Sequence, residues 1–105
     1  MQITTQPALE VVHFQSNPEV TDSQRTEAAN NMLETLQSWT GFIKRELIKV
    51  SDNQWIDVVH WTDSEAAMMA QESAMQSEAC LGFCSLMTVS EEQMYHGNIV
   101  LTLNA

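Results

Sequence analysis

The chain has 105 residues, of which 14 are acidic and 4 are basic, and its formal net charge is −10 at pH 7. Domains typically hold about 100–150 residues, so we expect residues 1–105 to form a single domain. Binding to phosphate backbones or anionic membranes needs patches of Lys and Arg. The composition therefore argues against nucleic acid and membrane surfaces as partners.

The sequence carries no signal that would direct the protein out of the cytoplasm. Its two cysteines are too few for a disulfide scaffold. Residues 1–6 lack the basic and apolar regions of a secretory signal. No window approaches the run of about 18 apolar residues that a spanning helix needs. We therefore expect a cytoplasmic protein.

The first part of the chain predicts a strand followed by a helix. Residues 8–15 are rich in apolar and β-branched side chains, which is typical of a strand. Thr21-Asp22-Ser23-Gln24 has the pattern of a capping box, which marks the start of a helix. Apolar residues then recur at helical spacing, and we expect this helix to end near Ser38, with Gly41 as the stop signal.

The remaining chain predicts a hairpin, a second helix and a closing strand. The expected ranges are residues 42–50 and 54–62 for the hairpin, 66–87 for the helix and 93–103 for the last strand. Thr62-Asp63-Ser64-Glu65 is a second capping box at the start of that helix. We expect a break in the helix either at Gly82 or in the region of Gln76-Ser77.

The resulting order, β-α-β-β-α-β, predicts a ferredoxin-like α+β sandwich, with a four-stranded antiparallel sheet and two helices on one face. If the other face met water, its side chains would be polar. In residues 54–62, however, Trp55, Val59 and Trp61 point one way while Ile56 and Val58 point the other. Large apolar patches usually mark interfaces. We therefore predict a homodimer formed sheet against sheet, the alternative being an error in the assigned strand register.

Two segments of the sequence resemble a known family. They are Trp39-Thr40-Gly41-Phe42-Ile43 and Trp55-Ile56-Asp57-Val58-Val59-His60-Trp61-Thr62-Asp63-Ser64-Glu65-Ala66-Ala67. They are similar to the antibiotic biosynthesis monooxygenases of the dimeric α/β-barrel superfamily. The resemblance implies a homodimer whose two sheets close into a barrel, with a ligand cavity between each sheet and its helices. Some members of the family oxidise polycyclic aromatic substrates with O₂ and no cofactor, and others degrade haem.

The resemblance also implies roles for two residues of the third predicted strand. Trp61 matches the strand-end tryptophan that lies near the substrate in cofactor-free members. Asp57 stands where such members can carry an asparagine, and a spacing of four keeps both side chains on one face. The haem-degrading members use a histidine in the second helix, but no histidine occurs between Trp61 and Tyr95. We therefore expect no haem and no other cofactor.

Asp57 and the two tryptophans of this strand each allow two interpretations. A buried carboxylate is either paired or has a raised pKa. Asp57 is thus either a base that removes a phenolic or enolic proton before O₂ attacks, or the partner of Arg45 or Lys44 in an ion pair across the hairpin. Trp55 and Trp61 either stack on an aromatic ligand or anchor the core and the dimer.

The three histidines, His13, His60 and His96, fall on three different predicted strands. We expect the first and third strands to run parallel at the centre of the sheet, which would bring all three histidines to one end. They would then form a zinc or iron site, supply one catalytic or ligand-binding imidazole, or only satisfy local polar groups. We predict ligand contacts for these residues and no metal.

Two functional hypotheses follow from the sequence. In the first, the protein is a cofactor-independent monooxygenase that acts on a small apolar molecule of aromatic or quinol type. Asp57 is then the proton acceptor, Trp61 the stacking platform, and His60 or His13 positions the substrate. In the second, the protein is a homodimer without enzymatic activity that binds a small ligand or has a structural role. An open cavity that both Asp57 and Trp61 face would favour the first hypothesis.

Overall fold

The computed structural model describes residues 6–88 and 93–105. The predicted absence of a secretory signal is based on residues 1–6, and residues 1–5 lie outside these ranges. The elements, in chain order, are β1 (Ala8–Ser16), α1 (Asp22–Asn30), α2 (Leu33–Ser38), β2 (Phe42–Lys49), β3 (Gln54–Trp61), α3 (Ser64–Ala74), α4 (Glu78–Cys84), β4 (Met87–Thr88) and β5 (Met94–Asn98). No helix in these ranges is both long enough and apolar enough to cross a membrane.

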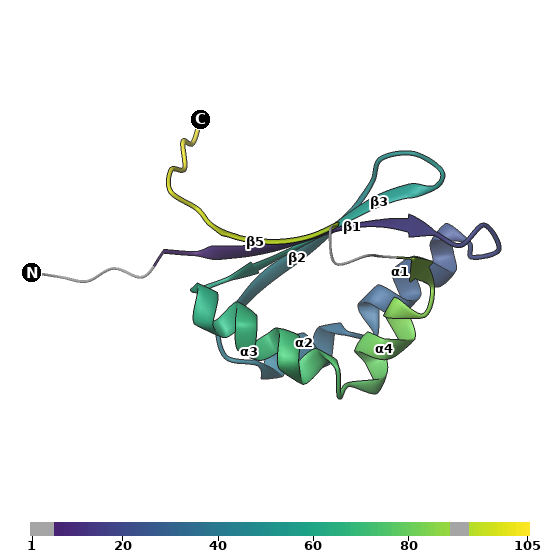
Figure 1. Cartoon of the computed structure of the whole chain (residues 1–105), viewed down its shortest axis with the longest axis horizontal. Helices are drawn as coiled ribbons and strands as arrows, with labels where there is room; N and C mark the ends of the chain where they lie inside the picture. The colour runs from purple at the N-terminus through teal and green to yellow at the C-terminus, as the bar shows by residue number, and fades with distance from the viewer. Residues whose placement is uncertain (1–5, 89–92) are drawn as a thin grey trace, which may run out of the picture.

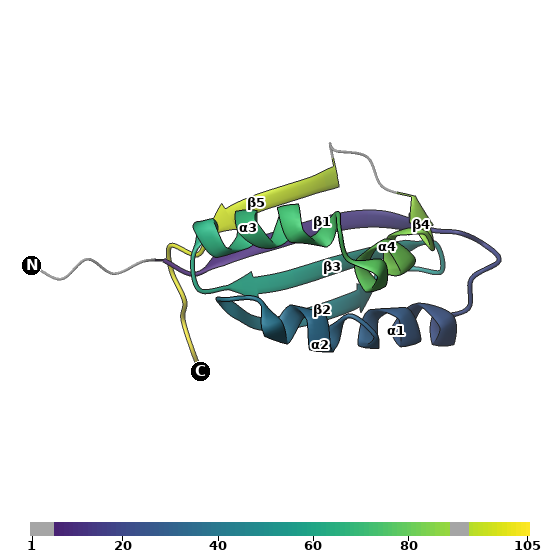
Figure 2. The same cartoon turned by 90° about the horizontal axis from the view of Figure 1, so that it is seen from below.

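The described strands form one antiparallel sheet in the order β2-β3-β1, and β4 and β5 both pair with the remaining edge of β1. β4 and β5 thus share the position of the fourth strand in a ferredoxin-like sheet. The described helices all lie on one face of the sheet (Figure 1). Seen from that face, α1 and α2 run along β2, and α3 lies over β1 and β5 (Figure 2). The predicted ferredoxin-like α+β fold is confirmed.

Each of the two predicted helices is divided in two. The first is interrupted after α1, where Asn30 and Asn31 stand together. Asparagine side chains compete with the helical hydrogen bonds of the backbone, which explains a break at this point. The second is interrupted between α3 and α4, in the predicted region of Gln76-Ser77, and Gly82 lies inside α4.

The helix starts follow the predicted capping chemistry with one change. The backbone N–H of Gln24 donates to Oγ1 of Thr21 at 3.1 Å, and the N–H of Thr21 donates to Oε1 of Gln24 at 2.8 Å, which completes the capping box. At α3 the cap is Asp63 and not Thr62. Its carboxylate accepts from the N–H of Ala66 at 2.8 Å.

The core lies between the sheet and the helices. From the strands it contains Ala8, Val12, Phe14, Trp55, Val59 and Trp61, and from the helical side Met32, Leu36, Ala66, Ala67, Ala70, Cys80 and Phe83. These strand residues alternate with half-buried or exposed ones, as one covered face requires. The uncovered face, which we call the outer face, presents Ile48 and Tyr95 at 43% and 57% exposure.

Candidate functional site

A cavity of about 50 Å³ lies in the core, between the sheet and both pairs of helices. Its strand residues are Glu10 of β1, Arg45 of β2, and Asp57, Val59 and Trp61 of β3. Its other lining residues are Met32, Leu36, Trp39, Ala70, Ala74 and Cys80. The predicted pair Asp57 and Trp61 thus shares this cavity, because the alternation of the strand directs both side chains to the helices.

Asp57 is engaged in an ion pair that spans the hairpin. Nε and Nη2 of Arg45 donate to its two carboxylate oxygens at 2.8 and 2.7 Å, and the two side chains are 9% and 11% exposed. The guanidinium also lies over the ring of Phe83, 4.6 Å from its centre. The ion pair that the sequence offered as one interpretation of Asp57 is therefore present. Its catalytic role stays a prediction.

Glu10 is a second carboxylate at this cavity, and it was not among the site residues predicted from the sequence. β1 pairs with β5 so that Glu10 faces His96, and Nε2 of His96 lies 3.2 Å from Oε2 of Glu10. Burial raises the pKa of Glu10 above its ordinary value, although the contact with His96 acts in the opposite direction. A signal was available in the sequence. Glu10 has the same strand parity as Val12 and Phe14, both of which are buried.

Trp61 is 2% exposed and packs edge to face against Phe42, with 5.7 Å between the ring centres. Its indole Nε1 is buried and has no hydrogen-bond partner in the part of the chain that the structure describes. Buried donors are normally satisfied, so an orphaned one beside a cavity marks a place where a polar group can bind. The predicted stacking role of Trp61 stays a prediction.

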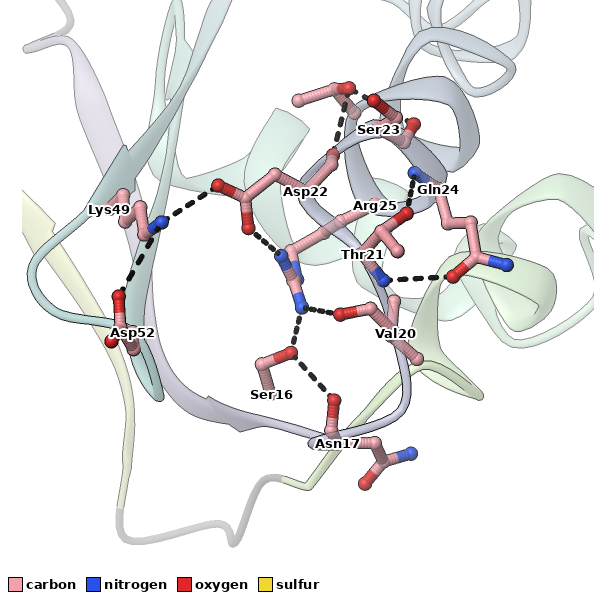
Figure 3. A network of polar contacts seen from close by, with 11 residues as sticks. Ser16, Asn17, Val20, Thr21, Asp22, Ser23, Gln24, Arg25, Lys49 and Asp52 are labelled. Atoms are coloured by element: carbon pink, nitrogen blue, oxygen red, sulfur yellow. Dashed lines mark hydrogen bonds and ion pairs between the residues drawn. The ribbon is translucent and has the colours of Figure 1, made fainter.

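Trp55 does not line this cavity, although it also points toward the helices. It lies six residues from Trp61 along β3, about 20 Å at the usual rise per residue. The guanidinium of Arg25 lies 4.4 Å from the centre of its ring. Figure 3 shows how Arg25 is held: it donates to Oγ of Ser16, to Oδ1 of Asp22 at 3.1 Å and to the carbonyl of Val20 at 3.3 Å. Trp55 is thus part of a structural cluster.

The prediction that the three histidines share one end of the sheet is wrong. β1 and β3 are antiparallel, so His13 lies opposite Ile56 while His60 lies opposite Leu9, about 13 Å apart along the strands. These two histidines are on the outer face, and His60 contacts Oε1 of Glu46 at 3.0 Å. His96 is on the other face. No group of three or more metal-ligating side chains occurs in residues 6–88 and 93–105.

A groove of about 430 Å³ lies next to the cavity, between the end of α2 and the start of α3. It is lined by Ser38, Trp39, Thr40, Thr62, Asp63, Glu65, Ala66, Met69, Ala70 and Ser73. Trp39 and Ala70 also line the cavity, so these two residues separate the groove from the buried charges. The groove and the cavity thus share Trp39 and Ala70 as a common wall.

Comparisons with known proteins identify the fold of the chain. No protein-family model and no curated protein sequence matches it. Among solved structures, it is similar to SnoaB from Streptomyces nogalater, described as a cofactor-independent oxygenase, with a TM-score of 0.70, 16% identity and coverage of 95% of this chain and 97% of SnoaB. A variant of SnoaB with asparagine changed to alanine matches equally well.

Two further structures share this arrangement. One is a protein of Pseudomonas aeruginosa, with a TM-score of 0.64, 12% identity and coverage of 95% and 100% of the two chains. The other is a heme-degrading protein of Mycobacterium tuberculosis, with a TM-score of 0.59, 14% identity and coverage of 97% and 100%. These likenesses confirm the ferredoxin-like fold of the single chain, and the homodimer stays a prediction. The chain has the ferredoxin-like subunit fold that these solved structures share.

Proposed function

We propose that the protein is a cofactor-independent monooxygenase that acts on a small aromatic or quinol-type molecule. The observation that carries the proposal is the cavity in the core that Glu10, Arg45, Asp57 and Trp61 line together. A carboxylate can remove a proton from an activated C–H group, and Arg45 can stabilise the anion that forms. The fold shared with SnoaB, described as a cofactor-independent oxygenase, supports this reading.

The proposed reaction converts an activated methylene group to a carbonyl. Loss of one proton to a carboxylate leaves a carbanion conjugated with the aromatic ring. Dioxygen takes electrons from this carbanion, forms a C–O bond and is protonated to a hydroperoxide. Loss of water then leaves the carbonyl, so that CH₂ and O₂ become C=O and H₂O. We expected Asp57 to be the acceptor, but its bidentate pair with Arg45 favours a role in holding the guanidinium in place.

The substrate would bind mainly in the groove. The cavity alone holds only one or two water molecules, because each occupies about 30 Å³. The groove of about 430 Å³ is within the usual range of ligand pockets, about 300–1,000 Å³. A flat ring in the groove would direct its reacting edge past Trp39 and Ala70. A substrate of this shape is apolar and uncharged, which suits a protein with net charge −10.

The proposal is tested by O₂ consumption with anthrone and with a hydroquinone. We expect the wild type to consume O₂ faster than buffer alone. We expect Ala70→Leu, which enlarges a side chain that lines both the groove and the cavity, to lose most of that rate. Met68→Leu is the matched control, because Met68 lies on the same helix, is 63% exposed and lines neither space. A wild-type rate equal to that of buffer with both substrates contradicts the oxygenase proposal.

A second candidate function is binding of a small ligand, or a structural role, without catalysis. The small volume of the cavity and the engagement of both oxygens of Asp57 favour it. Quenching of tryptophan fluorescence by anthrone under nitrogen distinguishes the two functions. Saturable quenching with no O₂ consumption in air would support a binding protein.

In either function, we propose that two copies of the chain associate through the outer face. The apolar residues Ile48 and Tyr95 are exposed there, and the helices cover only the opposite face (Figure 1). Half-buried Val11, Ile56 and Val58 continue this surface across β1 and β3. An apolar patch that crosses a whole sheet is typical of an interface.

A further inference from the structure

We propose that Glu10 is the group that accepts the substrate proton, and that His96 positions its carboxylate and exchanges the proton with solvent. This inference rests on the proposed function, because it assigns a step of the same reaction at the same cavity. Within residues 6–88 and 93–105, Glu10 and Asp57 are the two carboxylates that line the cavity, and we compare them as proton acceptors.

The hydrogen bonds distinguish the two carboxylates. Asp57 has both oxygens on Arg45, at 2.8 and 2.7 Å, so taking a proton would break a bidentate ion pair. Glu10 contacts His96 through Oε2. Proton transfer to Glu10 therefore leaves the guanidinium in place, ready to stabilise the anion of the substrate.

Solvent exposure increases from Glu10, at the cavity, to His96, at the edge of the sheet. The side chain of Glu10 is 19% exposed, and that of His96, on the edge strand β5, is 34% exposed. Histidine is the side chain best suited to exchange protons near neutral pH. The pair thus connects a buried acceptor with solvent, over a contact of 3.2 Å.

The surroundings of Glu10 suit a base. Its pKa is raised mainly by burial, and Asp57 acts in the same direction, while Arg45 and His96 oppose it. A carboxylate with a raised pKa is a stronger base when it is ionised. From the helices packed against this region, the titratable groups are the thiols of Cys80 and Cys84 on α4.

The proposed step moves one proton and no electrons. A C–H bond of the activated methylene breaks, its hydrogen bonds to a carboxylate oxygen of Glu10, and the electron pair stays on the substrate carbon. Arg45 faces the resulting carbanion. Dioxygen, the oxidant of the proposed reaction, then reacts with this carbanion, and the proton held by Glu10 returns to solvent through His96.

The direct test is hydrogen–deuterium exchange at the methylene group of anthrone, followed by proton NMR under nitrogen in D₂O. Without O₂, this measurement reports proton removal alone. We expect the wild type to accelerate exchange, and Glu10→Gln to lose at least about 100-fold of that acceleration, the usual contribution of a positioned base. Glu10→Asp keeps the carboxylate but shortens the side chain by one methylene group, and it should show an intermediate rate.

The matched control is Glu46→Gln. Glu46 also contacts a histidine across two strands, at 3.0 Å, but this pair lies on the outer face. We expect its exchange rate to equal that of the wild type. The exchange rate should fall at low pH, and we expect His96→Gln to shift the pH at which this fall occurs. A purely structural role of His96 would not produce such a shift. Thermal unfolding confirms that each variant is folded.

The outcomes separate this inference from the proposed function. Exchange that depends on Glu10 without O₂ consumption in air supports the proton acceptor and contradicts the oxygenase. O₂ consumption with the same exchange rate in the wild type, Glu10→Gln and Glu10→Asp overturns the role of Glu10 and leaves the oxygenase standing. No acceleration of exchange by the wild type also overturns the assignment of Glu10.

Discussion

At the scale of single residues, several charged side chains are buried between the sheet and the helices. Asp57 and Arg25 are among the buried residues, and Arg45 and Glu10 are largely covered. Burying a charge is unfavourable unless a partner and hydrogen bonds compensate for the lost water. Arg45 and Asp57 compensate one another, whereas Glu10 carries a raised pKa. This contrast underlies two predictions.

The first prediction concerns the ion pair between Arg45 and Asp57. Asp57→Asn leaves the guanidinium buried without its counter-ion, and we expect a loss of about 3–5 kcal/mol in the free energy of unfolding. Replacing both partners, with Arg45→Met and Asp57→Leu, should recover most of this loss. Urea unfolding of the single and double variants measures the difference. A single variant as stable as the wild type would show that the pair is not compensating a buried charge.

The second prediction concerns pH and Glu10. Its pKa is higher in the folded chain, so folding binds its proton more tightly. This contribution to stability is fully present below the ordinary pKa of 4.5 and is lost as the pH rises through the folded value. The melting temperature of Glu10→Gln relative to the wild type should therefore increase from pH 4 to pH 8. The control Gln15→Asn, on the same strand, should show no such trend.

At the scale of elements, the joint between β2 and α3 depends on one glycine. Gly41 has φ +89°, a left-handed conformation that other residues adopt at a cost. A Cβ at this position would lie 2.6 Å from both Ala66 Cβ and Thr62 Oγ1. The carbonyl of Gly41 also accepts from the N–H of Thr62 at 2.8 Å. The close approach ties the start of β2 to the end of β3 and to α3, beside the groove.

The third prediction follows from this contact. We expect Gly41→Ala to lower the free energy of unfolding by about 2–4 kcal/mol, because left-handed strain and overpacking act together. Gly82→Ala is the matched control. Gly82 lies in α4 with open space around its would-be Cβ, so alanine should stabilise the protein by about 1 kcal/mol. Chemical denaturation measures both, and equal effects would contradict the role of Gly41.

At the scale of the whole molecule, the unequal faces of the sheet determine how it would assemble. The helices shield one face (Figure 1). Apolar side chains, among them Ile48 and Tyr95, are exposed on the other. The net charge of −10 opposes open-ended aggregation through this face. A closed dimer, in which the outer faces of two chains pack against each other, would cover the apolar side chains.

The fourth prediction is the mass of the particle in solution. Light scattering should give a mass of twice 11.8 kDa for the wild type. Ile48→Glu places a charge on the outer face, and we expect it to shift the mass toward that of one chain. Leu33→Glu is the control, since Leu33 has a similar exposure, 47%, but lies on α2. A wild-type mass of 11.8 kDa would contradict the dimer.

Much of the fold could be predicted from the sequence because its signals are local. Hydrophobic alternation located β1 and β3, and the capping box at Thr21 located the start of α1. The alternation of strand side chains also predicted that Asp57 and Trp61 share a face. These patterns depend on residues within a few positions of one another, so no knowledge of distant contacts is needed.

The site could not be derived in the same way, because its groups meet through strand pairing. The pairing of β1 with β5 brings His96 to Glu10 across 86 positions, and the antiparallel pairing of β1 with β3 separates His13 from His60. The sequence by itself determined the order of the main strands and helical regions and the alternation of side chains along β1 and β3. Only the tertiary structure decided which charges are paired, because register and direction between strands depend on contacts distant in sequence.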